Sequence, residues 1–116
     1  MAADPYELTK FRGDSKPIAF KLWLDKAAGL ALDITGYSFK LTIDPEEEPA
    51  DDTGNILSLD GVLTSEADGE FQFEPTALEM DITPGEYYYD LEITDPAGNI
   101  ETQFVKKFTI VQDITK

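Results

Sequence analysis

The sequence predicts an all-β protein, an antiparallel β-sandwich of about seven strands, and three observations support that prediction. Apolar and polar residues alternate along most of the chain, which is the period of a strand with one buried face. Residues typical of turns (Gly, Pro, Asn and Asp) recur about every ten residues, as they do between short strands. No helical pattern is long enough to connect two parallel strands, so we expect antiparallel pairing.

The first half of the chain contains four predicted strands, at residues 6–12, 17–24, 30–34 and 37–44. The second is the strongest, and its alternation puts four apolar side chains on one face: Ile18, Phe20, Leu22 and Leu24. The fourth strand alternates as cleanly, with Tyr37, Phe39, Leu41 and Ile43 on one face. Both strands are therefore expected to contribute to the core.

The second half contains further strands, predicted at residues 56–59, 62–64, 70–74, 84–94 and 100–111. The pair Asp60-Gly61 is a hairpin signal between the first two of these strands. Residues 75–80 are expected to form one helical turn. In the last strand, Lys106 shares its parity with apolar residues, and an unpaired lysine is not tolerated in a dry core. We therefore expect a β-bulge near residues 105–107.

Length and composition predict one domain, residues 1–116, and weigh against catalysis. The chain has no Cys and no His. It therefore lacks thiolate nucleophiles, the usual general base and the most common ligands of transition metals. Pairs of carboxylates occur, but a chain with 24 acidic residues contains such pairs by chance. We expect no enzyme activity, no catalytic residues and no cofactor.

The charge is strongly negative and unevenly distributed. The formal net charge is −15, and residues 44–101 contain eighteen acidic residues without a single Lys or Arg. Nucleic acid and anionic membranes are therefore not expected as partners. Three interpretations of the acidic block remain open: a solvated surface that maintains solubility, a surface for a basic protein partner, or a site for cations.

The densest acidic segment is a predicted loop at residues 45–55, whose acidic residues are Glu46, Glu47, Glu48, Asp51 and Asp52. Clustered carboxylates suit Ca²⁺, but the spacing does not match the twelve-residue calcium-binding loop. Two prolines also restrict how the carboxylates could converge. We therefore predict no metal site, and treat these five acidic residues as candidates for an interface.

Two aromatic residues, Trp23 and Tyr88, are out of phase with the apolar residues of their own strands. Their side chains are therefore expected on the outer faces of the sandwich. Exposed aromatic residues are enriched at protein interfaces, so both are interface candidates, although each could instead cover a rim of the core. A subunit contact through them would make the protein a homo-oligomer, a trimer or a hexamer.

One segment resembles a known structural corner. Asp81, Gly85 and Tyr87, followed by alternating apolar residues, resemble the corner before the sixth strand of immunoglobulin-like domains. In such corners the tyrosine hydroxyl bonds back to the backbone a few residues upstream. The resemblance implies that Tyr87 does the same. It also narrows the prediction to an immunoglobulin-like β-sandwich without the disulfide.

A second resemblance extends over most of the chain and rests on short motifs at residues 11–15, 17–20, 32–36, 84–91 and 108–110. In this order they resemble the N-terminal module of tailed-phage upper-baseplate proteins. The resemblance implies a structural protein of the virion, a tail-tip or baseplate adaptor that contacts other virion proteins. It implies no catalytic residues.

The alternatives to that function are a capsid decoration or head–tail connector protein and, in another class, a cell-surface or carbohydrate-binding adhesin module. An adhesin should carry aromatic residues in the loops at one end of the sandwich, and the predicted loops contain almost none. The virion, assembled in the host cytoplasm, is therefore the expected location.

Overall fold

The computed structural model describes residues 2–3, 7–47 and 54–112, and for residues 2–3 only the backbone. The described residues form nine strands: β1 (Ala2–Ala3), β2 (Leu8–Phe11), β3 (Ile18–Asp25), β4 (Leu30–Ala31), β5 (Ser38–Asp44), β6 (Leu57–Ser65), β7 (Glu70–Phe73), β8 (Gly85–Thr94) and β9 (Ile100–Val111). The prediction of an all-β, immunoglobulin-like fold is confirmed. In the part of the chain described here, no helix could span a membrane.

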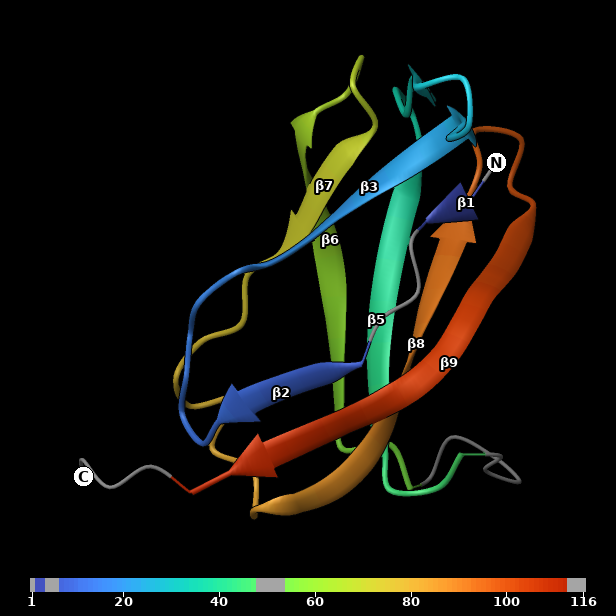
Figure 1. Ribbon diagram of the computed structural model, residues 1–116. Coiled ribbons are helices and arrows are strands. Elements are labelled where there is room, and N and C mark those ends of the chain that lie inside the picture. Colours follow the sequence, from blue (N-terminus) through green and yellow to red (C-terminus); the bar gives the residue numbers. More distant parts are fainter. Residues whose placement is uncertain (1, 4–6, 48–53, 113–116) are drawn as a thin grey trace.

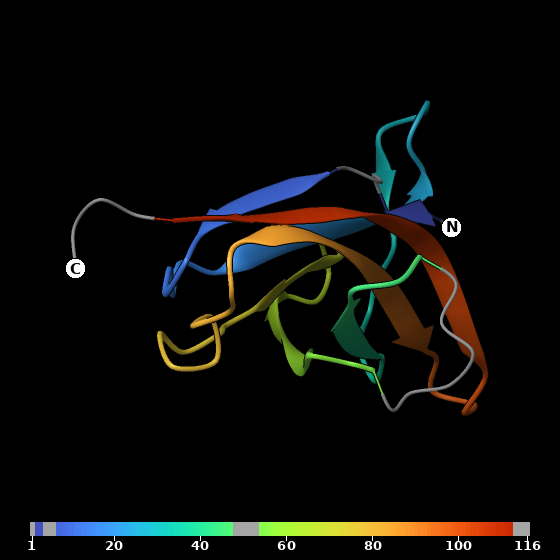
Figure 2. The same cartoon turned by 90° about the horizontal axis from the view of Figure 1, so that it is seen from below.

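The strands form one strongly curled sheet in the order β1-β3-β7-β6-β5-β8-β9-β2, with β4 paired to β3 (Figure 1). The curl brings β3 and β7 over the inner face of β5, β8 and β9, as the view from below shows (Figure 2). Strand β6 joins the two halves, since Leu57–Asp60 pair with β5 and Gly61–Ser65 pair with β7. The two halves therefore pack as the layers of a sandwich.

The core lies between these layers and consists of the inward residues of every long strand. Alternation places Ile18, Phe20 and Leu22 of β3 there, as predicted, and all three are buried. The largest fully buried side chains include Phe71, Phe73, Tyr89 and Phe108. Within the layers, Phe20 stacks on Phe71 and Tyr89 meets Phe108 edge to face. Across the layers, Phe39 of β5 stacks on Phe71 of β7.

The end of β3 departs from the predicted alternation. Leu24 was expected on the core face, but its side chain is 57% exposed. The register between β3 and β4 shifts between Trp23 and Asp25. A bulge of this kind turns the following side chain away from its expected face.

Strand β6 is continuous where the sequence predicts a hairpin. Asp60 and Gly61 lie in the middle of β6, and Gly61 pairs with Phe73. A Cβ atom at Gly61 would lie 2.9 Å from the Cβ of Phe39 and 3.4 Å from a ring carbon of Phe73. The glycine is therefore needed for close packing where β6 passes from one layer to the other, and not for a turn.

Strand β2 runs parallel to β9, contrary to the expectation of purely antiparallel pairing. Leu8 pairs with Phe108, and Phe11 pairs with Val111. No crossover helix is needed, because nearly the whole sandwich lies between these two strands in the sequence. The prediction of antiparallel pairing applies to strands that follow one another in the chain, because two such strands can be parallel only if a crossover connects them.

The bulge in the last strand lies earlier than predicted. The register between β8 and β9 shifts between Leu91 and Glu92, which face Phe104 and Thr102, so Gln103 is the extra residue. The shift reverses the face of the preceding residues, and Ile100 is 66% exposed. Lys106 keeps its parity opposite Tyr89 but is exposed, so no bulge is needed to remove it from the core.

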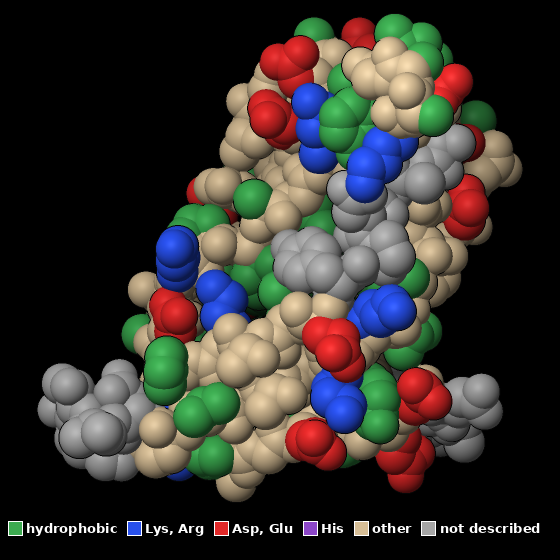
Figure 3. Space-filling model, in the orientation of Figure 1, with side chains coloured by type: hydrophobic (Ala, Val, Ile, Leu, Met, Phe, Trp, Pro, Cys, Tyr) green, Lys and Arg blue, Asp and Glu red, His purple; other side chains and the backbone are tan. Residues whose placement is uncertain are grey.

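Positive and negative side chains mix on the face that carries β2, β3 and β9 (Figure 3). Lys10 belongs to β2, Lys21 to β3, and Lys106 and Lys107 to β9. The acidic block at residues 44–101 instead covers the chain from the end of β5 to the start of β9.

Candidate functional site

The outer faces of β5 and β8 bring together polar residues that are far apart in the sequence. Asp44 pairs with Tyr88, and Thr42 pairs with Asp90. All four alternate with buried residues of the same strands, so their side chains are on the outer face of the sheet. On the next strand, Val105 lies opposite Asp90.

A small pocket of about 50 Å³ opens on this outer face. The segments that follow β5 and precede β6 form its remaining wall; they lie at the lower end of the molecule in Figure 1. Its lining residues are Thr42, Asp44, Glu46, Glu47, Asn55, Tyr88, Tyr89, Asp90 and Val105. Four of these nine are acidic and none is basic, so the pocket is suited to a positively charged group.

Asp44 is the most unusual residue of the pocket, because its side chain is only 6% exposed. One carboxylate oxygen, Oδ1, accepts a hydrogen bond of 2.8 Å from the backbone N–H of Glu46. The other, Oδ2, is buried and has no hydrogen-bond partner among the described residues. Gly54 lies beside it, since a Cβ there would be in van der Waals contact with Oδ2 at 3.4 Å. A buried carboxylate oxygen without a partner costs free energy that a bound cation would recover.

Asp90 contributes a second carboxylate with an altered acidity. Partial burial raises the pKa of Asp90, and the negative charge of Glu92 raises it further. Two lysines are diagonal to Asp90 in register, Lys107 opposite Tyr88 and Lys40 opposite Glu92, and neither lines the pocket. The Nζ of Lys107 is 3.5 Å from Glu86. The negative charge of the pocket is therefore not matched by a cation that lines it.

The acidic residues of the pocket do not converge as metal ligands do. Within residues 7–47 and 54–112, no group of three or more carboxylates is arranged to hold a metal ion. His and Cys are absent from the whole sequence. What the pocket offers is one buried acceptor, further carboxylates and a tyrosine ring, a set that suits an organic cation.

Three of the predicted interface residues meet at this pocket, namely Glu46, Glu47 and Tyr88. Glu48, Asp51 and Asp52 lie outside the described residues. Nothing in the sequence singles out Asp44, Asp90 and Asn55, whose contributions depend on strand register and on the position of the residues just before β6. The one available signal was the alternation of residues 37–44, which places Asp44 on the outer face of its strand.

Trp23 lies apart from the pocket, on β3 of the opposite layer. The ammonium group of Lys21 is 4.5 Å from the centre of the Trp23 ring, a cation–π contact. The ring is partly buried, and Trp23 pairs with Ala31 of β4. Trp23 and Tyr88 therefore do not form one surface patch, and the predicted trimer or hexamer stays a prediction.

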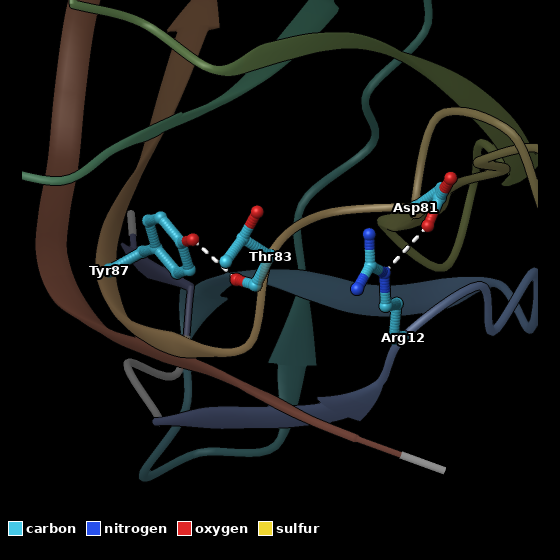
Figure 4. A network of polar contacts seen from close by, with 4 residues as sticks. All are labelled: Arg12, Asp81, Thr83 and Tyr87. Atoms are coloured by element: carbon cyan, nitrogen blue, oxygen red, sulfur yellow. Dashed lines mark hydrogen bonds and ion pairs between the residues drawn. The ribbon is translucent and has the colours of Figure 1, made fainter.

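The corner residues before β8 make two separate polar contacts (Figure 4). The hydroxyl of Tyr87 donates a hydrogen bond to the backbone carbonyl of Thr83. Asp81 is not part of this bond; its carboxylate accepts a 2.6 Å hydrogen bond from Nε of Arg12 and forms an ion pair with it. The corner thus anchors the start of β8, and Arg12 ties it to the turn after β2.

Comparisons with known proteins identify the fold. No family model matches the chain, and no curated protein matches it. Among solved structures, CopC from Methylosinus trichosporium OB3b superposes with a TM-score of 0.51 over 100% of this chain and 95% of that one. The chain shares the fold of CopC. The sequence identity of 14% is low, so the similarity to CopC is one of fold alone.

The predicted identity as a phage virion protein is wrong. CopC, whose structure matches along the whole chain, is not a phage protein, and nothing supports the tail, baseplate, capsid or connector roles. The predicted location in a virion is wrong for the same reason. The motifs behind the resemblance are turns and corners, such as the turn at Gly13 and the corner at Tyr87. Such features recur in unrelated β-sandwiches because they serve the fold.

Proposed function

We propose that this protein is a non-enzymatic binding module that recognises a basic segment of another protein through the pocket on the outer face of β5 and β8. The observation that carries the proposal is Asp44, a buried carboxylate with an unpartnered oxygen in an acidic pocket. The chain would gain most from a partner that supplies the missing positive charge.

The charge distribution supports a basic partner. The net charge of −15 attracts cationic proteins over several ångströms and accelerates their association at low salt. The acidic block covers the elements that form the pocket, whereas the face over β2, β3 and β9 also carries Lys and Arg. A basic segment would find complementary charge at the pocket, where four of the nine lining residues are acidic and none is basic. The same charge disfavours nucleic acid and anionic membranes.

The size of the pocket supports binding rather than catalysis. Small-molecule sites usually enclose ~300–1,000 Å³. The pocket holds about 50 Å³, room for one functional group and not for a whole substrate. Catalysis would also have to proceed without His or Cys. A side chain that projects from a partner protein fits these dimensions.

The test is a titration of the protein with a short Lys-rich peptide, with a Glu-rich peptide of equal length as the control. We expect the Lys-rich peptide to bind and its affinity to fall as salt rises from about 50 mM to about 300 mM, where exposed charges are screened. Asp90→Asn should weaken binding, whereas Asp60→Asn, at an exposed position of β6 outside the pocket, should have a smaller effect. Equal binding by the two variants, or no binding at low salt, would contradict the proposal.

A further inference from the structure

Two exposed apolar side chains, Phe11 and Val111, lie side by side where β2 and β9 end (Figure 1). Phe11 is 55% exposed and Val111 is 38% exposed. Ile110 is buried, and successive side chains of a strand point to opposite faces, so Val111 is on the outer face of the sheet. Strand β8 begins at Gly85, opposite Ile110, so within the described residues Val111 has a paired neighbour only on β2. We call Phe11 and Val111 the apolar pair.

The apolar pair is on the same face of the sheet as the pocket. Val105 lines the pocket, and Val111 follows it by six residues on β9. Residues separated by an even number of positions point to one face of a strand, and the register shows no shift between these two valines. At ~3.3 Å per residue, Val105 and Val111 are about 20 Å apart. One face of β9 therefore connects an acidic end, at the pocket, with an apolar end.

Between these two ends the outer face of β9 carries Lys107 and Thr109. The Nζ of Lys107 is 3.5 Å from a carboxylate oxygen of Glu86, so its charge is largely balanced. Thr109 pairs with Thr9 on one side and with Glu86 on the other. The attraction for a basic residue is therefore concentrated at the pocket end, where four of the nine lining residues are acidic. A partner that follows β9 gains from charge at one end and from apolar contact at the other.

A second copy of this chain is a poor occupant of the apolar pair. Each copy has a formal net charge of −15, so two copies repel one another. Two side chains also bury far less than the ~800 Å² per partner of a standard stable interface. An extended segment of a basic protein meets neither obstacle, because its charge is opposite and it can contact the pocket as well.

From this arrangement we infer that the recognised segment of the partner is extended and has two anchors, a basic residue at the pocket and an apolar residue six positions away over the apolar pair. The inference rests on the proposed function and specifies it. Residues six positions apart in an extended chain point to the same side and span about 20 Å, which matches the distance along β9. Residues five positions apart point to opposite sides, so the spacing becomes part of the recognition.

The experiment compares capped nine-residue peptides of Ser and Thr that carry one Lys and one Leu. The two anchors are six positions apart in one peptide and five apart in the other, and each peptide is made with Lys first and with Leu first. In protein-observed NMR titrations we expect the six-position spacing, in at least one order, to bind at least about threefold more tightly, because only there can the leucine cover the apolar pair while the lysine is at the pocket. The backbone signals of Phe11, Val105 and Asp90 should shift together. Equal affinities for the two spacings in both orders would overturn the inference.

Phe11→Ser should abolish the preference for the six-position spacing. Leu24→Ser is the matched control, because it removes a similarly exposed side chain from β3, and it should retain the preference. If the melting curve shows that Phe11→Ser does not fold, Val111→Ser takes its place. A preference that survives the loss of the apolar pair would contradict the inference, and so would a wild-type dimer, measured by light scattering, that Phe11→Ser dissociates.

The outcomes separate this inference from the proposed function. If the Lys-rich peptide binds and depends on Asp90, but the two spacings bind equally, the proposed function stands and the two-anchor inference fails. If the Lys-rich peptide does not bind at low salt, the proposed function itself fails.

Discussion

Asp44 and Asp90 are diagonal neighbours on the outer face of β5 and β8, because Asp44 pairs with Tyr88 while Asp90 pairs with Thr42, two residues away on each strand. Diagonal neighbours of this kind are within reach of a common partner. Both carboxylates line one pocket, and no Lys or Arg lines it with them. Burial and the charge of Glu92 already raise the pKa of Asp90, so a cation beside it would favour its ionised form. This relationship is the basis of the binding function proposed above.

The pKa of Asp90 leads to a prediction about stability and pH. Desolvation raises this pKa in the folded protein, and Glu92 raises it further, so the ionised form is disfavoured by folding. The stability associated with neutral Asp90 is fully present below the ordinary pKa of an aspartate and is lost as pH rises through the raised pKa. Asp90→Asn should therefore raise the melting temperature at neutral pH, and the gain should shrink in acid. Melting curves across this pH range measure it; a gain independent of pH would contradict the assigned cause.

The pKa of Asp95 is shifted in the opposite direction, so this residue should stabilise the fold at neutral pH instead of in acid. Hydrogen bonds from the Asn99 side chain and then from its backbone N–H lower the pKa of Asp95, with smaller contributions from Ala97 and Gly98. Its contribution to stability is present above the ordinary aspartate pKa and is lost as pH falls through the lowered pKa. Asp95→Ala should lower the melting temperature at neutral pH, and the difference from the wild type should vanish in strong acid. Asp60→Ala, at an exposed position of β6, is the control; an undiminished difference in acid would refute the prediction.

The Tyr87 hydroxyl should contribute to stability through its bond to the Thr83 carbonyl. Tyr87→Phe removes the donor but retains the ring, and we expect the free energy of unfolding to fall by about 1 kcal/mol. Urea denaturation measures the loss. Tyr88→Phe is the matched control, because Tyr88 is the next residue of β8 and its side chain is on the outer face of the sheet. Equal stability of the two variants would show that the corner bond contributes nothing.

Gly61 should be the least replaceable residue of β6. A Cβ there would approach the Cβ of Phe39 to 2.9 Å, closer than real Cβ contacts allow. Gly61→Ala should lower the free energy of unfolding by about 1–3 kcal/mol, the range typical of overpacking. Val62→Ala, at the exposed neighbouring position, should cost less. A neutral or stabilising effect of Gly61→Ala in denaturation experiments would mean that the two layers can separate at this point without cost.

Several elements were predictable because their signal is local. The alternation in β3, β5 and β8 assigned the core residues of these strands correctly except for Leu24 at the end of β3, since side chains of successive residues point to opposite faces in a regular strand. The hairpin predicted at Asp60-Gly61 was wrong, because the same dipeptide occurs both in hairpin turns and at crowded points within strands. The displaced bulge at Gln103 reversed the expected face of Ile100 for a related reason, since a bulge is a property of the strand pair and not of one strand.

The candidate site was only partly visible in the sequence. Charge density pointed to Glu46 and Glu47, and the phase of its strand pointed to Tyr88. All three line the pocket. Asp90 appeared as one acidic residue among 24, because nothing local predicts which strand will lie beside it. The resemblance to phage proteins failed because it rested on turns and corners, which many β-sandwiches need for folding.

By itself, the sequence determined the all-β class, the inward faces of the main strands, the strong negative charge, and the absence of His and Cys. These properties depend on composition or on neighbours along the chain. Only the tertiary structure decided that β6 joins both layers, that β2 runs parallel to β9, and that Asp44 is buried with a single occupied oxygen. Register, burial and hydrogen-bond pairing arise between residues far apart in the chain, so their energies are set when the layers pack.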